Sequence, residues 1–278
     1  MYAMQSRELF AKITMRRKNM FEQEILDMLE TDAPLKAAWD DCIIAGFRGS
    51  IAHGTYDDIT GIDDVDVMGV MVPKLSNYIG LHSVGQIVRE PKDSKWDFVI
   101  YEVRKYIRLL IKANPNVLSL LWLPDHLYLK RTLLGDLLIS NRQIFMTRAL
   151  HKSFGGYANA QLHKMTHFAK GNGYMGKKRK ALVAEHGYDT KNASHLVRLL
   201  RMGIEIKETG ILNVVRPDAM ELLDIKRGKW LLKDVEHEAN RLFVQFKEID
   251  SVLPAAVDEA EAERLLMKII TEHLGVKV

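Results

Sequence analysis

The sequence has little of what marks a secreted, disulfide-bonded or membrane protein. It contains a single cysteine, Cys42, in 278 residues, which excludes an internal disulfide framework and any zinc site built on several cysteines. Cys42 borders an apolar run and is expected to be a small core residue. No run approaches the roughly 18 apolar residues of a membrane span. The segment Met1–Glu8 has no apolar signal core, so we expect a cytoplasmic protein with no membrane partner.

Motifs that read nucleic-acid bases are also absent: the sequence has no RNP motif, KH loop or zinc finger. Its charge, however, is unevenly distributed. Residues 1–124 carry 15 basic and 17 acidic side chains, residues 151–201 carry 10 and 2, and residues 202–278 carry 11 and 15. The basic block at 151–201 suits a polyanion, because Lys and Arg displace counterions from phosphates. It is equally typical of a solvated helical face.

The apolar periodicity predicts an α+β protein. Strands are expected near residues 43–48, 65–72, 84–89 and 96–101, with a short fifth strand at 127–129. Helices are expected at 21–30, 33–41, 102–114, 131–139, 141–169, 190–209, 218–226, 231–250 and 256–274. This order predicts a mixed sheet with flanking helices at residues 1–126, followed by an all-helical domain at residues 127–278.

Asp64 and Asp66 are the most informative residues. Their neighbours within Asp64–Val72 are β-formers, which favours a buried strand, and carboxylates two residues apart on a strand project from one face. Two such charges repel unless a cation lies between them. A divalent metal is the usual cation, and nucleotide phosphates supply its remaining oxygen ligands. The alternative is a surface turn, because residues 57–63 are rich in turn formers.

Gly49 and Ser50 follow an apolar strand and precede this acidic pair, and small residues allow a phosphate to approach the backbone. The pattern resembles the signature of the DNA polymerase β-like nucleotidyltransferase superfamily. Within it, three blocks are similar to the RlaP-type nucleotidyltransferases of bacteria and phages. The blocks are Gly49–Thr55 with Asp63–Val70, Glu102–Leu118, and Lys191–Arg201 with Ile225–Trp230. One departure is Ser119, where many relatives are expected to carry an acid.

The resemblance implies an enzyme that transfers a nucleoside monophosphate from an NTP to a hydroxyl and releases pyrophosphate. It implies two Mg²⁺ ions, or Mn²⁺ in their place, held by Asp64, Asp66 and a third carboxylate on a nearby strand. Asp97 is the favoured third ligand. Glu102 is the alternative, although its place at a strand-to-helix junction is also explained by helix capping.

The same resemblance implies a set of nucleotide contacts. Gly49 and Ser50 are expected at the β- and γ-phosphates. His53 is expected at the leaving pyrophosphate, or else only at a backbone carbonyl. Lys191, His195 and Arg198 share one helical face, opposite an apolar stripe. That face is expected to contact the triphosphate or the acceptor strand.

RNA, at a 3′ end such as that of a tRNA, is the expected acceptor, because RlaP-like proteins are implied in RNA repair and because of the basic block. The alternatives are transfer to a protein or small-molecule hydroxyl, and a catalytically silent nucleotide- or RNA-binding module.

Residues 171–178 mimic a P-loop, but Lys178 stands where the Mg²⁺-binding Ser or Thr belongs and a helix precedes them. A mobile basic loop is expected there.

Overall fold

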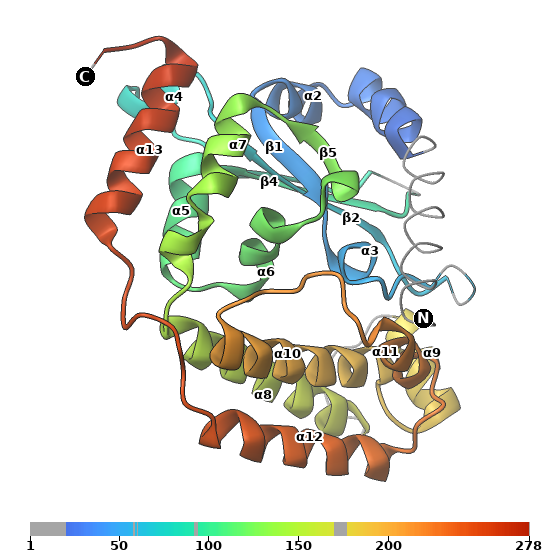
Figure 1. Ribbon diagram of the computed structural model, residues 1–278. Coiled ribbons are helices and arrows are strands. Elements are labelled where there is room, and N and C mark those ends of the chain that lie inside the picture. The colour runs from blue at the N-terminus through green and yellow to red at the C-terminus, as the bar shows by residue number, and fades with distance from the viewer. Residues whose placement is uncertain (1–20, 58, 60, 92–93, 170–176, 278) are drawn as a thin grey trace. The chain divides into compact units, whose positions relative to one another are not determined.

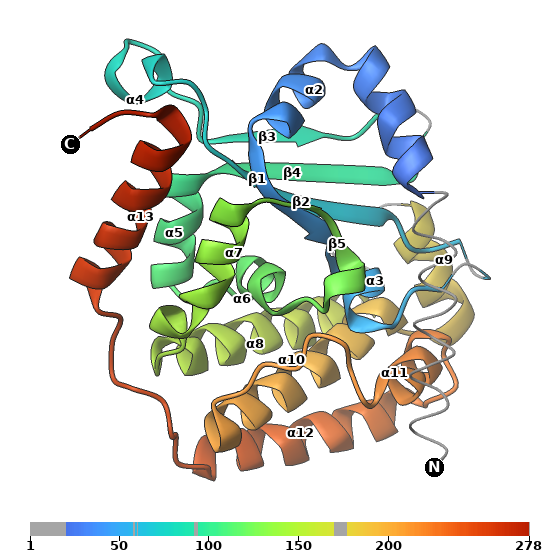
Figure 2. The same cartoon turned by 45° about the horizontal axis from the view of Figure 1, so that its top comes forward.

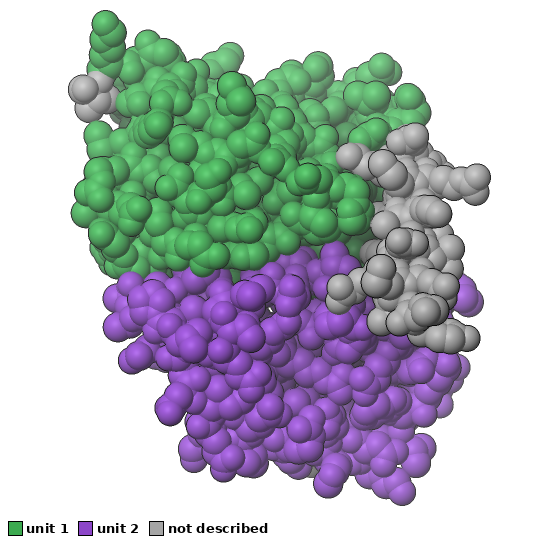
Figure 3. Space-filling model, viewed as in Figure 1, with its two compact units in different colours: residues 1–54, 63–145, 257–278 green, residues 55–62, 146–256 purple. Residues whose placement is uncertain are grey.

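The computed structural model describes residues 21–57, 59, 61–91, 94–169 and 177–277. The chain divides into two compact units, coloured separately in Figure 3. Unit 1 comprises residues 1–54, 63–145 and 257–278, and unit 2 comprises residues 55–62 and 146–256. This division differs from the expected boundary at 126/127, because each unit gathers segments that are far apart in the sequence.

Unit 1 is built on a five-stranded mixed sheet, which confirms the predicted α+β class. The strand order is β3-β4-β2-β1-β5, and only β2 and β4 run parallel to each other among the paired strands. The strands are β1 (Cys42–Phe47), β2 (Val65–Met71), β3 (Gln86–Arg89), β4 (Trp96–Glu102) and β5 (Tyr128–Arg131) (Figure 1). Because β5 pairs with β1, the chain beyond residue 126 still belongs to the sheet.

Helices cover both faces of this sheet (Figure 2). One face carries the helical residues 21–31 and α2 (Ala33–Asp40), and the other carries α5 (Val103–Ile111), α6 (Pro115–Leu118) and α7 (Leu133–Ser140). The last helix of the chain, α13 (Glu259–Leu274), packs on α5 and α7 and is therefore part of unit 1. Short elements complete the unit: α3 (Gly49–His53), α4 (Ser76–Ile79), η1 (Ser119–Trp122), η2 (Asp125–Leu127) and η3 (Arg142–Phe145).

The central strands are buried on both faces because helices cover both sides of the sheet. Every residue of β1 is buried. Cys42, the first of them, is 2% exposed, and burial raises the pKa of its thiol to about 12. A thiol of this kind is an inert core group, as the sequence predicted.

Unit 2 is helical and is organised around α10 (Thr190–Thr209), which packs against α8 (Ala149–Ala169), α11 (Ala219–Lys226) and α12 (Leu232–Glu248). Its buried face includes Ala193, Leu196, Val197 and Leu200, the stripe that the helical period predicted. The basic helix α9 (Lys177–His186) precedes it. Part of the expected basic loop is thus helical, and the rest, residues 170–176, lies outside the described residues.

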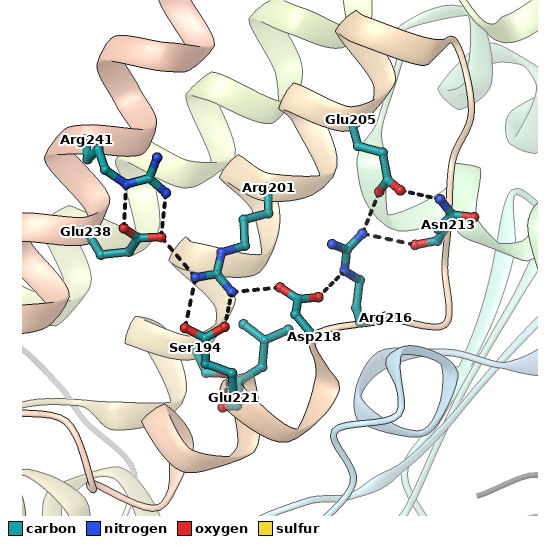
Figure 4. A network of polar contacts seen from close by, with 10 residues as sticks. Ser194, Arg201, Glu205, Asn213, Arg216, Asp218, Glu221, Glu238 and Arg241 are labelled. Carbon is teal, nitrogen blue, oxygen red and sulfur yellow. Dashed lines mark hydrogen bonds and ion pairs between the residues drawn. The ribbon is translucent and has the colours of Figure 1, made fainter. Parts of the chain in front are cut away.

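An arginine–carboxylate network joins the helices of unit 2 (Figure 4). Arg201 on α10 reaches α11 and α12 at once. Its partners are Asp218 at 2.9 Å, Glu221 at 2.7 Å and Glu238 at 2.9 Å. Arg216 extends the network with bonds to Glu205 at 2.7 Å and Asp218 at 2.9 Å.

None of the helices in the described part of the chain has the length and apolar character needed to cross a membrane.

Candidate active site

Two of the predicted carboxylates lie side by side in unit 1. Asp66 on β2 and Asp97 on β4 are register partners in neighbouring parallel strands, so both side chains project from the same face of the sheet. Both are half-buried. The structure therefore brings Asp66 and Asp97 together across 31 positions of sequence.

Arg48 bridges this pair. Its Nη2 donates to Oδ2 of Asp97 at 2.7 Å and lies 3.4 Å from Oδ1 of Asp66. Its backbone N–H also donates to the carbonyl oxygen of Asp66 at 2.9 Å. The sequence signal that would have placed Arg48 is the repulsion between two adjacent carboxylates, which a cation relieves.

Gly49 lies directly against the Asp66 carboxylate. Its φ is +61°, a left-handed conformation that costs other residues free energy, and a Cβ at this position would meet Oδ2 of Asp66. Ser50 and His53, on the same short helix α3, are both buried. Gly49 thus adjoins Asp66 of the acidic pair, and Ser50 follows it in the chain.

The remaining carboxylate candidates lie elsewhere. Asp64 directly precedes β2 and is half-buried. Glu102 pairs with Met71 at the far end of β2 and β4, and its carboxylate accepts the backbone N–H groups of Arg104 at 2.9 Å and Lys105 at 3.0 Å. Glu102 therefore caps α5, the role that its junction position suggested. The structure places Asp97, not Glu102, beside Asp66.

Asp66 and Asp97 supply two carboxylates to a magnesium ion, and the remaining oxygen ligands must come from elsewhere. Over the described residues, no three His, Cys, Asp or Glu side chains gather closely enough to hold a metal ion, so Asp64 does not complete a group with Asp66 and Asp97. Two carboxylates are nevertheless sufficient on the protein side, since Mg²⁺ commonly takes one or two and completes its shell with water and substrate phosphates. The donor set of Asp66 and Asp97 is of that kind.

In unit 2, α10 brings together the predicted basic residues. Burial, followed by the charges of Arg198 and Lys191, holds the pKa of His195 well below its ordinary range. His195 is therefore neutral at neutral pH. Burial and the neighbouring Arg216 lower the pKa of Arg198 to about 10, so Arg198 still carries its charge. Its Nη1 donates to Sδ of Met202 at 3.3 Å.

Two further cations lie near His195 and were not among the predicted site residues. Arg179 and Lys226 both contribute to the low pKa of His195. Arg179 Nη1 donates to both carboxylate oxygens of Asp189 at 2.8 Å, and Asp189 caps the start of α10. We call Arg179, Lys191, Arg198 and Lys226 the cationic cluster. The sequence could have identified Lys226 as a site residue through its place in the family-like block Ile225–Trp230.

In this mixed sheet Gly49 and Ser50 follow β1, and a carboxylate on β2 pairs with one on β4. This arrangement defines a DNA polymerase β-like nucleotidyltransferase fold. The chain belongs to the RlaP family, described as the RNA repair pathway DNA polymerase beta family, whose model matches residues 22–266. No curated protein matches the chain. A nucleotidyltransferase-like protein from Exiguobacterium sibiricum, known from a crystal structure, is similar at 13% identity over 88% of this chain and 76% of its own. The TM-score is 0.27, and the likeness carries no argument about function.

Proposed function

We propose that this protein transfers a nucleoside monophosphate from an NTP to a hydroxyl group and releases pyrophosphate. The observation that carries the proposal is the register pair of Asp66 and Asp97 beside Gly49. Paired carboxylates that can hold a metal ion suit phosphoryl-group chemistry, because positioning and charge neutralisation supply most of its catalysis. Membership of the RlaP family supports the same reaction class.

Each residue of the acidic site then has a role. Asp66 and Asp97 would hold a Mg²⁺ or Mn²⁺ ion that neutralises phosphate charge and polarises the attacking hydroxyl, and Asp64 is proposed as a ligand of a second ion. Asp97 orients that hydroxyl or accepts its proton. Ser50 and the backbone of Gly49 contact the β- and γ-phosphates, and His53 contacts the leaving pyrophosphate.

The face of α10 that carries Lys191, His195 and Arg198 is proposed to contact the triphosphate or the acceptor backbone. Arg198 supplies a fixed charge, whereas neutral His195 supplies only a hydrogen bond. The proposed acceptor is an RNA 3′ end, which the link between the family and RNA repair supports. The exposed side chains of Lys178 and Lys180 on α9 add positive charge suited to phosphates.

The substitution Asp66→Asn tests the reaction. It keeps the size of the side chain but removes a charge on which the chemistry depends, so transfer from labelled NTP with Mg²⁺ should fall by about 10²-fold or more. Asp40→Asn is the control, because Asp40 is an exposed carboxylate of unit 1 that pairs only locally, with Lys36 at 3.0 Å. The assay offers cellular RNA and protein extract separately. Label on protein alone would redirect the proposal to protein nucleotidylylation, and full activity of Asp66→Asn would contradict the mechanism.

A further inference from the structure

The block Ile225–Trp230 has no part in the chemistry proposed above. Two of its cations, Lys226 and Arg227, nevertheless bond to a segment that lies between Ser50 and Asp64 in the sequence. This segment, residues 55–62, connects α3 to β2 and is assigned to unit 2. We call it the linking segment. Lys226 Nζ donates to the carbonyl oxygen of Thr55 at 2.8 Å. Arg227 donates to both carboxylate oxygens of Asp57, from Nε at 2.9 Å and from Nη2 at 3.1 Å.

The other end of the linking segment is held in the same way. Lys191 Nζ, at the start of α10, donates to the carbonyl oxygen of Ile62 at 3.2 Å. Three cations of unit 2 thus bond to the first, third and last residues of an eight-residue segment. Ile62 lies two residues before Asp64. Thr55 lies two residues after His53.

These contacts are buried, and that makes them specific. Asp57 is 1% exposed and Lys226 is 4% exposed. A buried charge is retained only where it is paired and hydrogen-bonded, and a two-pronged arginine–carboxylate contact fixes geometry as well as charge. Thr55 and Asp57 therefore each have one favoured place on unit 2.

The turn that presents Lys226 and Arg227 is itself fixed. Thr190 Oγ1 donates to the carbonyl oxygen of Lys226 at 2.7 Å, and Tyr188 OH donates to that of Trp230 at 2.7 Å. Gly228 between them has a φ of +73° and abuts the ring of His186, where a Cβ would not fit. The end of α11 is thus anchored to the residues that begin α10.

We propose that Lys226 and Arg227 are positioning residues for the nucleotidyl transfer reaction. By fixing Thr55 and Asp57, they restrain the stretch that precedes these residues and carries Ser50 and His53, while Lys191 holds Ile62, which is close to Asp64 in sequence. Successive Cα atoms are only about 3.8 Å apart, so the single residue between Thr55 and His53, and the single residue between Ile62 and Asp64, transmit little slack. This inference rests on the proposed function for its effect on rate, but the restraint itself is a property of unit 2.

The competing interpretation is that Lys226 and Arg227 bind substrate phosphate directly. Against it, phosphate binding would have to remove Arg227 from Asp57 and leave a buried carboxylate without its partner, which is strongly unfavourable. The two interpretations differ in kinetics. A substrate interaction that is the same in the ground and transition states changes KM, whereas poorer positioning lowers kcat.

The test compares Arg227→Lys, Lys226→Met and Asp57→Asn with the control Lys229→Met. Arg227→Lys keeps the charge but cannot form the two-pronged arrangement. Lys229 lies in the same turn, and its exposed side chain pairs with Asp224 at 2.6 Å, away from the linking segment. We expect kcat to fall about 10- to 100-fold in the three variants, with KM for NTP within about twofold of wild type. The control should match wild type.

Amide hydrogen exchange of residues 54–66 gives a second readout that needs no activity. Exchange should accelerate in the three variants and not in Lys229→Met, because removal of the anchors lets the segment open locally. A raised KM with unchanged kcat, or unchanged exchange, would overturn the inference. If the wild-type protein transfers no nucleotide, the proposed function fails, and the exchange data alone then support or overturn the restraint. If Lys226→Met or Asp57→Asn fails to fold, Arg227→Lys, the mildest of the three substitutions, decides the test.

Discussion

Replacing Gly49 with alanine tests whether the observed place of Asp66 matters. The φ of +61° at Gly49 costs an L-residue about 1–2 kcal/mol. The new Cβ would also meet the Asp66 carboxylate, so Asp66 must move away. Because a displacement of about 1 Å can cost about 10²-fold in rate, we expect Gly49→Ala to lose about 100-fold in kcat as well as the strain energy.

Gly275→Ala provides the matched control for this experiment. Gly275 also belongs to unit 1 and has a φ of +64°, but nothing lies within 4 Å of the Cβ that alanine would add. Urea unfolding should show the backbone strain in both variants and a larger loss of stability in Gly49→Ala, because Asp66 must also move there. Steady-state nucleotidyl transfer should fall only in Gly49→Ala. Equal activity of the two variants would refute the reasoning, because Asp66 would then not need its place beside Gly49.

Two further predictions concern unit 2. When Lys178 and Lys180 are both replaced by alanine, the slope of log RNA affinity against log salt should become shallower by about 1.4, since each single-strand phosphate that is no longer neutralised contributes about 0.7. Filter binding at several salt concentrations measures this slope. An unchanged slope would place the RNA away from α9. Hydrogen bonds from Arg241, and then from Arg201, outweigh burial and lower the pKa of Glu238. Its contribution to stability is therefore complete above its unfolded pKa of about 4.3 and is lost as the pH falls through the folded value. Urea midpoints should drop in acid, and the drop should be smaller in Glu238→Gln; an equal drop would show that Glu238 is not responsible.

Long, regular elements could be predicted from the sequence, because each contains enough residues to show its period. The expected helix at 190–209 coincides with α10, and all five strands lie where apolar alternation placed them. The short helix α3 was not predicted, since five residues give no helical period to read.

Contacts between distant charges could not be predicted in the same way. Asp57 lies in a turn-rich run, and its local sequence is typical of a solvated surface acid. In the structure it is almost fully buried, because Arg227, 170 positions further along the chain, supplies its counter-charge. Local pattern describes the backbone around a residue, but the exposure of a charged side chain depends on whether a partner reaches it. The same contacts agree with the division of the chain, since residues 55–62 group with unit 2, where Lys191, Lys226 and Arg227 lie.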